Sequence, residues 1–110
     1  MNWDSAKSFC TSLNENTHLI EIFNSNQQYF IEQKGQELGI YGDNMWTGLT
    51  YVGSSWYWDY SKLKANFFDW EGSNYNQASS TNNRVRLCGN WEWHPRPSSN
   101  SHYPICQYTS

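Results

Sequence analysis

Aromatic side chains constrain this chain more than any other feature of its sequence. Seven tryptophans, eight tyrosines and five phenylalanines make up 18% of 110 residues, whereas only 15% of the residues are charged. Each aromatic ring can bury on the order of 150–250 Å², so a chain with room for only one domain can still build an efficient core. Asn, Ser, Gln and Thr supply most of the polar residues in place of charged ones. This composition favours a turn-rich fold containing strands over a helical bundle.

The first third of the chain has helical periodicity. Trp3, Ala6, Cys10 and Leu13 recur at spacings of three and four, which predicts a helix with these residues on one face. Asn2 is the expected N-cap, because its side chain can accept a hydrogen bond from an amide of the first turn.

A short strand is expected over residues 17–22, followed by a second helix over residues 25–38. Ser25 is its expected cap, and Gly39 stands where helices commonly end. One apolar stripe of this helix is expected to consist of Phe23, Phe30, Ile31 and Leu38.

From residue 45 onward the pattern is that of strands and turns. Strands are expected over residues 46–52, 56–60, 84–87, 91–93 and 102–108. Residues 71–83 are rich in Asn, Ser, Gly and Gln and predict a long loop, which in a compact domain is usually functional or mobile. Two helices followed by strands indicate an α+β architecture.

The three cysteines leave one without an intramolecular partner. A bridge between Cys10 and Cys106 would close a loop of about 96 residues and stabilise the domain by roughly 4–5 kcal/mol. Cys88 would then be a partly buried thiol in a hairpin, a reactive sulfur, or one half of an intermolecular bridge. A zinc site is not expected, since the chain has no CxxC spacing and its histidines are scattered.

Six short motifs follow one another along the chain. They are Trp3-x-x-Ala6-x-x-x-Cys10, His18-Leu19-x-x-Ile22 with Phe30-Ile31, Trp46-Thr47-Gly48-Leu49, Trp56-x-Trp58-Asp59, Phe68 with Trp70, and Pro104-Ile105-Cys106-Gln107. Their order and spacing resemble those of a C-type-lectin-like domain over nearly the whole chain.

The resemblance implies a fold and a location. The expected fold is α+β and C-type lectin-like: two helices flanking small antiparallel sheets, with a long irregular loop, in a single domain over residues 1–110. The family's first strand would precede Met1, and it normally pairs with the last strand. The strand around residues 103–108 is therefore expected to have an exposed edge. The resemblance also implies an extracellular protein, either secreted or the ectodomain of a membrane protein.

Sugar-binding members of the family hold calcium through a Glu-Pro-Asn or Gln-Pro-Asp triplet, a nearby Glu and a Trp-Asn-Asp segment, because calcium prefers six to eight oxygen ligands. Residues 71–74 here are Glu-Gly-Ser-Asn without proline, and Trp-His-Pro at 93–95 stands where Trp-Asn-Asp is expected. We therefore expect no metal site and no cofactor. The alternative is a weak calcium site at Glu71, Asn74 and Glu92.

Five residues are candidates for ligand binding. Oxygen atoms would come from Glu71, Asn74 and Glu92, and rings that can stack on a sugar face from Tyr75 and Trp91. The expected function is a non-catalytic binding module for carbohydrate or a protein partner without the usual calcium site. The alternatives are a calcium-dependent lectin with a non-standard loop site and an ice- or mineral-associating protein. The sequence contains no hydrolase, phosphate-loop or metalloprotease motif, so an enzyme is not expected.

Charge and hydropathy exclude other partners. The net charge of −3 and the scattered basic residues give no footprint for nucleic acid, and no apolar run is long enough for membrane insertion. A dimer could form through the exposed edge strand or through Cys88.

Overall fold

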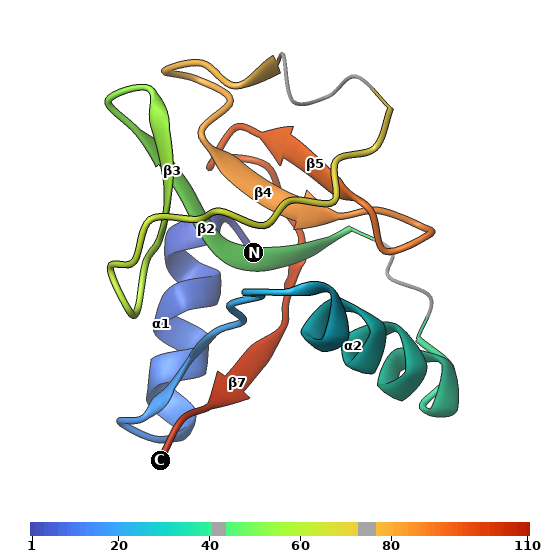
Figure 1. Ribbon diagram of the computed structural model, residues 1–110. Coiled ribbons are helices and arrows are strands. Elements are labelled where there is room, and N and C mark those ends of the chain that lie inside the picture. Colours follow the sequence, from blue (N-terminus) through green and yellow to red (C-terminus); the bar gives the residue numbers. More distant parts are fainter. Residues whose placement is uncertain (41–43, 73–76) are drawn as a thin grey trace.

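The computed structural model describes residues 1–40, 44–72 and 77–110. Its elements are α1 (Trp3–Leu13), β1 (Thr17–Leu19), α2 (Ser25–Glu37), β2 (Met45–Val52), β3 (Ser55–Trp58), β4 (Arg84–Leu87), β5 (Trp93–Arg96), β6 (Tyr103–Pro104) and β7 (Cys106–Tyr108). The α+β expectation is confirmed, with both helices in the first third of the chain (Figure 1).

The strands form two sheets. In the larger sheet the order is β3-β2-β4-β5 with antiparallel neighbours, and β6 adds to β2 in parallel. The smaller sheet is the antiparallel pair of β1 and β7. The expectation of antiparallel sheets therefore holds except for β6. In Figure 1, β7 descends between the two helices.

The predicted closing strand is divided at Ile105 into β6 and β7. The division arises because the two parts pair with different partners: β6 lies beside β2, whereas β7 lies beside β1. The second strand of the predicted hairpin also moves, from residues 91–93 to β5. Trp91 instead belongs to the turn, where its backbone has φ 68° and its amide donates to the Cys88 carbonyl at 2.8 Å.

The helix caps agree with the sequence analysis at α1 and differ at α2. The Asn2 side chain accepts a hydrogen bond from the Ser5 amide at 2.8 Å, as predicted. At α2 the cap is Asn24, which accepts from the Gln27 amide at 2.9 Å, and Ser25 is the first helical residue. Gly39 follows the helix end with φ 74°, a conformation that favours glycine.

The predicted apolar stripe at α2 is divided between the core and the surface, since Phe23 and Ile31 pack against the main core cluster. Phe30 and Leu38 are 63% and 68% exposed, and the buried residues of this helix are Gln28 and Gly35. The Gln28 amide group explains the orientation. It donates to the Trp91 carbonyl at 2.9 Å and accepts from the Trp93 indole at 3.0 Å, so the polar side chain faces inward.

Tryptophans and aliphatic residues fill the core. Trp46, Trp58 and Trp93 are at most 1% exposed, and Trp3 and Trp56 are also buried. A Cys10–Cys106 disulfide joins α1 to β7, as the sequence suggested, and Cys88 is a buried free thiol. Across the described residues, no helix has the length and apolar character needed to cross a membrane.

Candidate functional site

Two of the five predicted ligand residues meet where the long loop leaves the core and β4 turns into β5. The Cys88 thiol donates to Glu71 Oε2 at 2.9 Å and to the Glu92 carbonyl at 3.1 Å. The Asn90 amide group donates to Glu92 Oε1 at 2.5 Å. We call Glu71, Cys88, Asn90 and Glu92 the carboxylate cluster. Asn74 and Tyr75 lie outside the described residues.

Backbone pairing positions this cluster. The Glu71 amide donates to the Trp93 carbonyl at 3.0 Å, and the Trp93 amide donates to the Asp69 carbonyl at 2.8 Å. Residues 69–71 therefore lie alongside the start of β5. The tight turn at residues 88–91 places Glu92 next to them, so two acidic side chains 21 positions apart share one end of the sheet.

The protonation of the cluster follows from its hydrogen bonds and burial. The hydrogen bond from Cys88 is the largest cause of the lowered pKa of Glu71. Burial opposes it, and the electrostatic effects of His94, Arg86 and Arg96 each add a smaller lowering. Burial, followed by the bond to Glu71, raises the pKa of Cys88 to about 11. Burial, and then the charge of Glu92, raises the pKa of Asp69. The site therefore holds the ionised carboxylate of Glu71 beside a neutral thiol.

Besides the hydrogen bond from Cys88, arginine charge acts on Glu71 through space and lowers its pKa. Arg86 Nη2 lies 3.1 Å from His94 Nδ1. Burial, followed by the charges of Arg96 and Arg86, lowers the pKa of His94, so the positive charge here is that of the guanidinium groups. Trp93 and Pro95 are fully buried, so residues 93–95 present only the half-buried imidazole of His94 outward. Among the described residues, no group of three His, Cys, Asp or Glu side chains could hold a metal ion.

The structure places Trp91 in the core, whereas the sequence analysis took it as a stacking surface for sugar. Its side chain is 5% exposed and belongs to the main core cluster. The cause is α2: an added Cβ at Gly35 would lie 2.2 Å from the Trp91 ring, so the indole occupies space that only glycine leaves free. Most of the ring is therefore unavailable to a sugar.

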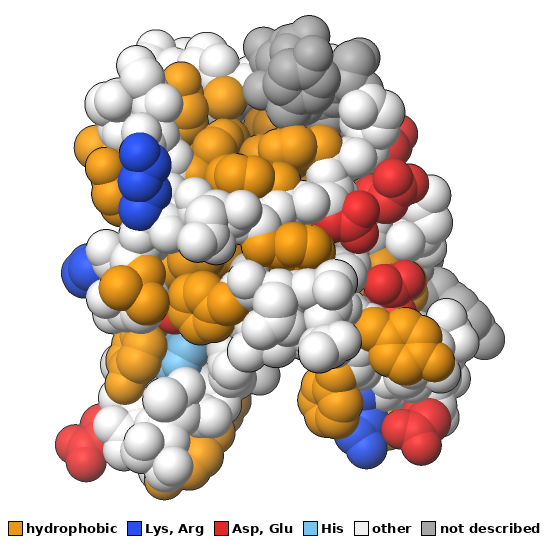
Figure 2. All heavy atoms as spheres, viewed as in Figure 1, with side chains coloured by type: hydrophobic (Ala, Val, Ile, Leu, Met, Phe, Trp, Pro, Cys, Tyr) orange, Lys and Arg blue, Asp and Glu red, His pale blue; other side chains and the backbone are white. Residues whose placement is uncertain are grey.

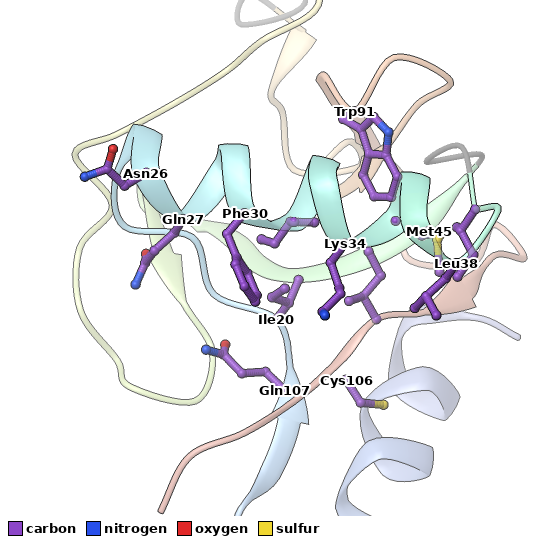
Figure 3. Close-up of a pocket in the computed structure, with 14 residues that line it drawn as sticks. Ile20, Asn26, Gln27, Phe30, Lys34, Leu38, Met45, Trp91, Cys106 and Gln107 are labelled. Atoms are coloured by element: carbon purple, nitrogen blue, oxygen red, sulfur yellow. The ribbon is translucent and has the colours of Figure 1, made fainter.

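Sequence reasoning missed a groove of about 510 Å³ between α2 and β7, which we call the apolar groove. It is lined by Ile20, Asn26, Gln27, Phe30, Ile31, Lys34, Gly35, Leu38, Ile40, Met45, Trp91, Ile105, Cys106 and Gln107. Figure 3 shows Phe30, Lys34 and Leu38 projecting from α2 toward β7, and Figure 2 shows the molecule hollowed at its lower edge between these elements.

Two sequence signals could have located the missed residues. The first is the apolar stripe of the second helix, which contains the groove residues Phe30, Ile31 and Leu38. The alternation Arg-Val-Arg-Leu in β4 and Trp-His-Pro-Arg in β5 placed basic residues on one face of a hairpin. That second pattern was treated only as a pair of strands.

Comparison with known proteins agrees with this architecture. A family model described as the lectin C-type domain matches residues 1–108. Human lithostathine has a TM-score of 0.82 at 20% identity over 99% of this chain and 85% of its own. The cow C-type carbohydrate-recognition domain of CD23 has a TM-score of 0.79 at 17% identity over 100% and 82%.

A calcium-independent type II antifreeze protein is also similar, with a TM-score of 0.77 at 21% identity over 98% of this chain and 79% of that chain. Identities this low establish a shared fold and leave the ligand open, since one fold serves many functions.

Proposed function

This chain belongs to the C-type lectin domain family, and from that premise we propose that it is a non-catalytic extracellular module that binds a glycan or a protein partner without calcium. The residues proposed to contact ligand in the long loop are Glu71, Asn74, Tyr75 and Glu92. Trp91 would contribute only the part of its ring that reaches the apolar groove.

The observation that carries the proposal is the charge around Glu71. The hydrogen bond from Cys88 lowers the pKa of this carboxylate most, and the guanidinium charges of Arg86 and Arg96 lower it further. The same charges repel a divalent cation at that position. A calcium ion also requires six to eight oxygen ligands, and the neighbouring Glu92 carboxylate is already bonded to the Asn90 amide group.

Two further features support a binding module over an enzyme. The Cys88 thiol has a pKa of about 11 and is buried, so it is not an activated nucleophile at neutral pH. The Cys10–Cys106 disulfide is typical of proteins that fold in an oxidising compartment, which supports an extracellular location.

A thermal melt tests the calcium-independent function. Calcium that binds only the native state stabilises it by RT ln(1 + [L]/Kd). We expect the midpoint in millimolar calcium to equal the midpoint in excess chelator within about 1 °C, because no bound ion is there to be lost. The matched control is magnesium at the same concentration and ionic strength.

An upward shift of several degrees with calcium and not with magnesium would contradict the proposal. It would support the alternative of a calcium-dependent lectin that uses a non-standard site in the long loop. A glycan array with and without chelator would then identify the sugar.

A further inference from the structure

All three arginines of this chain lie on β4 and β5. Alternate residues of these strands, Val85, Leu87, Trp93 and Pro95, are buried. The intervening residues therefore occupy the opposite face of the hairpin. They are Arg84, Arg86, His94 and Arg96. The strand register places Arg84 opposite Arg96 and Arg86 opposite His94.

Basic residues directly opposite one another across two strands are unfavourable unless something neutralises them. Within residues 1–40, 44–72 and 77–110, the ion pairs are made by lysines with Asp59 or Glu37 and never by an arginine. Arg84 has a separate partner, since its guanidinium lies 4.4 Å from the centre of the Trp3 ring. Arg86, His94 and Arg96 are left as a group.

His102 completes this group, which we call the cationic cluster: Arg86, His94, Arg96 and His102. Burial, followed by the positive charges of Arg86 and Arg96, lowers the pKa of His102 to about 4, so at neutral pH the charge of the cluster is carried by the two arginines. All four are half-buried. Glu71 lies near this cluster, and its negative charge raises the pKa of Arg86 and of His94 against the other effects.

The cluster has more hydrogen-bond donors than the protein uses. Arg86 donates to the Asn44 side chain and lies 3.1 Å from His94 Nδ1, which must accept because a guanidinium has no acceptor. Arg96 Nη1 donates to the Pro95 carbonyl at 3.2 Å, and the described residues give Arg96 no other hydrogen bond. Arg86 Nε and His102 Nε2 are buried without a hydrogen-bond partner among the described residues.

Two of the pKa shifts indicate the same excess of positive charge. Burial, and then Arg96, lowers the pKa of Arg86, and burial followed by Arg96 and Arg86 lowers the pKa of His94. Positively charged groups that repel one another are stabilised when a negatively charged group binds between them.

We propose that the cationic cluster binds the oxyanion groups, sulfate or carboxylate, of an acidic glycan. The planar guanidinium fork of Arg96 matches the two oxygens of such a group in a bidentate contact, and Arg86 supplies the second positive charge beside it. This proposal rests on the proposed function, because it names a glycan class for a module that binds without calcium.

Binding of defined oligosaccharides in excess chelator tests the proposal. The probes are a heparin hexasaccharide, which carries sulfates and carboxylates, and a hyaluronan hexasaccharide, which carries carboxylates alone. We expect Arg96→Gln and Arg86→Gln each to weaken binding about tenfold, the effect of losing one charge-assisted contact. Lys64→Gln is the matched control: it removes the same charge from an exposed side chain elsewhere, and we expect a change of less than about twofold.

Folding is checked on the same samples. Loss of one member of a like-charged pair removes repulsion, so Arg96→Gln should leave the melting midpoint unchanged or raise it. Arg96→Lys keeps the charge and loses the fork, and it should also weaken binding. Binding of both probes assigns carboxylate recognition, and binding of the heparin fragment alone assigns sulfate.

Failure of both hexasaccharides to bind at low salt, or an equal loss in Lys64→Gln, would overturn the proposal. A repeat of the titration in millimolar calcium separates these outcomes from failure of the proposed function, because hexasaccharide binding that appears only with calcium would contradict recognition without calcium. In that case the arginine variants would still report on the cationic cluster.

Discussion

At the scale of single residues, buried polar side chains position the turn between β4 and β5. The Gln28 amide group holds the Trp91 carbonyl and the Trp93 indole from the helix side. Glu21 acts similarly at another turn, where Oε2 accepts from the amides of Tyr60 and Ser61 at 2.9 and 3.0 Å. Each bond satisfies a group whose burial without a partner would cost about 1–3 kcal/mol.

Cys88 gives a prediction at this scale. Because burial and the bond to Glu71 raise its pKa to about 11, its thiolate fraction at pH 8 is lower than that of an unperturbed thiol by about a hundredfold. Iodoacetamide should therefore alkylate Cys88 in the native protein at least about a hundredfold more slowly than in urea-unfolded protein with the disulfide intact. Mass spectrometry over time measures both rates.

The same experiment tests whether two copies of the chain form a dimer through a disulfide between their Cys88 residues. Rapid native alkylation, or a covalent dimer on a non-reducing gel, would show that the thiol leaves its buried position. The structure favours the simplest of the three interpretations made from the sequence, a buried thiol in a hairpin turn.

At the scale of elements, α2 is attached to the core through a polar residue and a glycine. Gly35 allows the Trp91 ring to approach the helix backbone closely, and an added Cβ would lie 2.2 Å from two ring carbons. Phe30 and Leu38 are exposed and line the apolar groove together with Gly35.

Gly35→Ala tests this packing, because the contact with Trp91 decides whether the substitution raises or lowers the free energy of unfolding. Alanine in a helix interior is normally more stable than glycine by about 1 kcal/mol. Here the clash with Trp91 should outweigh that gain and destabilise the protein by about 1–3 kcal/mol. Urea unfolding measures the change. Gly53→Ala serves as the comparison, since φ is 57° there and nothing lies within 4 Å of the added Cβ, leaving backbone strain alone. A stabilised Gly35→Ala protein would contradict the described contact.

The edge of β7 shows a second consequence of element pairing. Ile20 donates to the Ile105 carbonyl and Thr109 donates to the Asn16 carbonyl, so bonded pairs alternate along the strand. The backbone groups of Cys106 and Tyr108 therefore face away from β1. Among the described residues, the strand that pairs with β7 is β1. Pairing of two copies there stays a prediction.

At the scale of the whole molecule, the Cys10–Cys106 disulfide joins two parts of the chain separated by 96 positions. It connects the core cluster around Trp3 and Trp46 to β7. Replacing both cysteines with alanine should lower the free energy of unfolding by roughly 4–5 kcal/mol, because the unfolded chain regains the freedom that the loop closure removed.

Urea denaturation measures this change, with Cys88→Ala as the matched control for loss of a sulfur outside the bridge. A loss below about 1 kcal/mol in the double variant would show that packing alone holds β7 in place. Such a result would assign the stability of the molecule to its aromatic core.

The sequence by itself determined the features that depend on near neighbours. The Asn2 cap, the α1 periodicity, the strand expected over residues 46–52 and the order of family motifs follow from residues a few positions apart. The tertiary structure alone decided which face of α2 points inward and the burial of Trp91. Those outcomes depend on partners such as Gln28 and Trp93, which lie 65 positions apart. Local periodicity identifies a face of an element, but the packing of distant elements decides what that face meets.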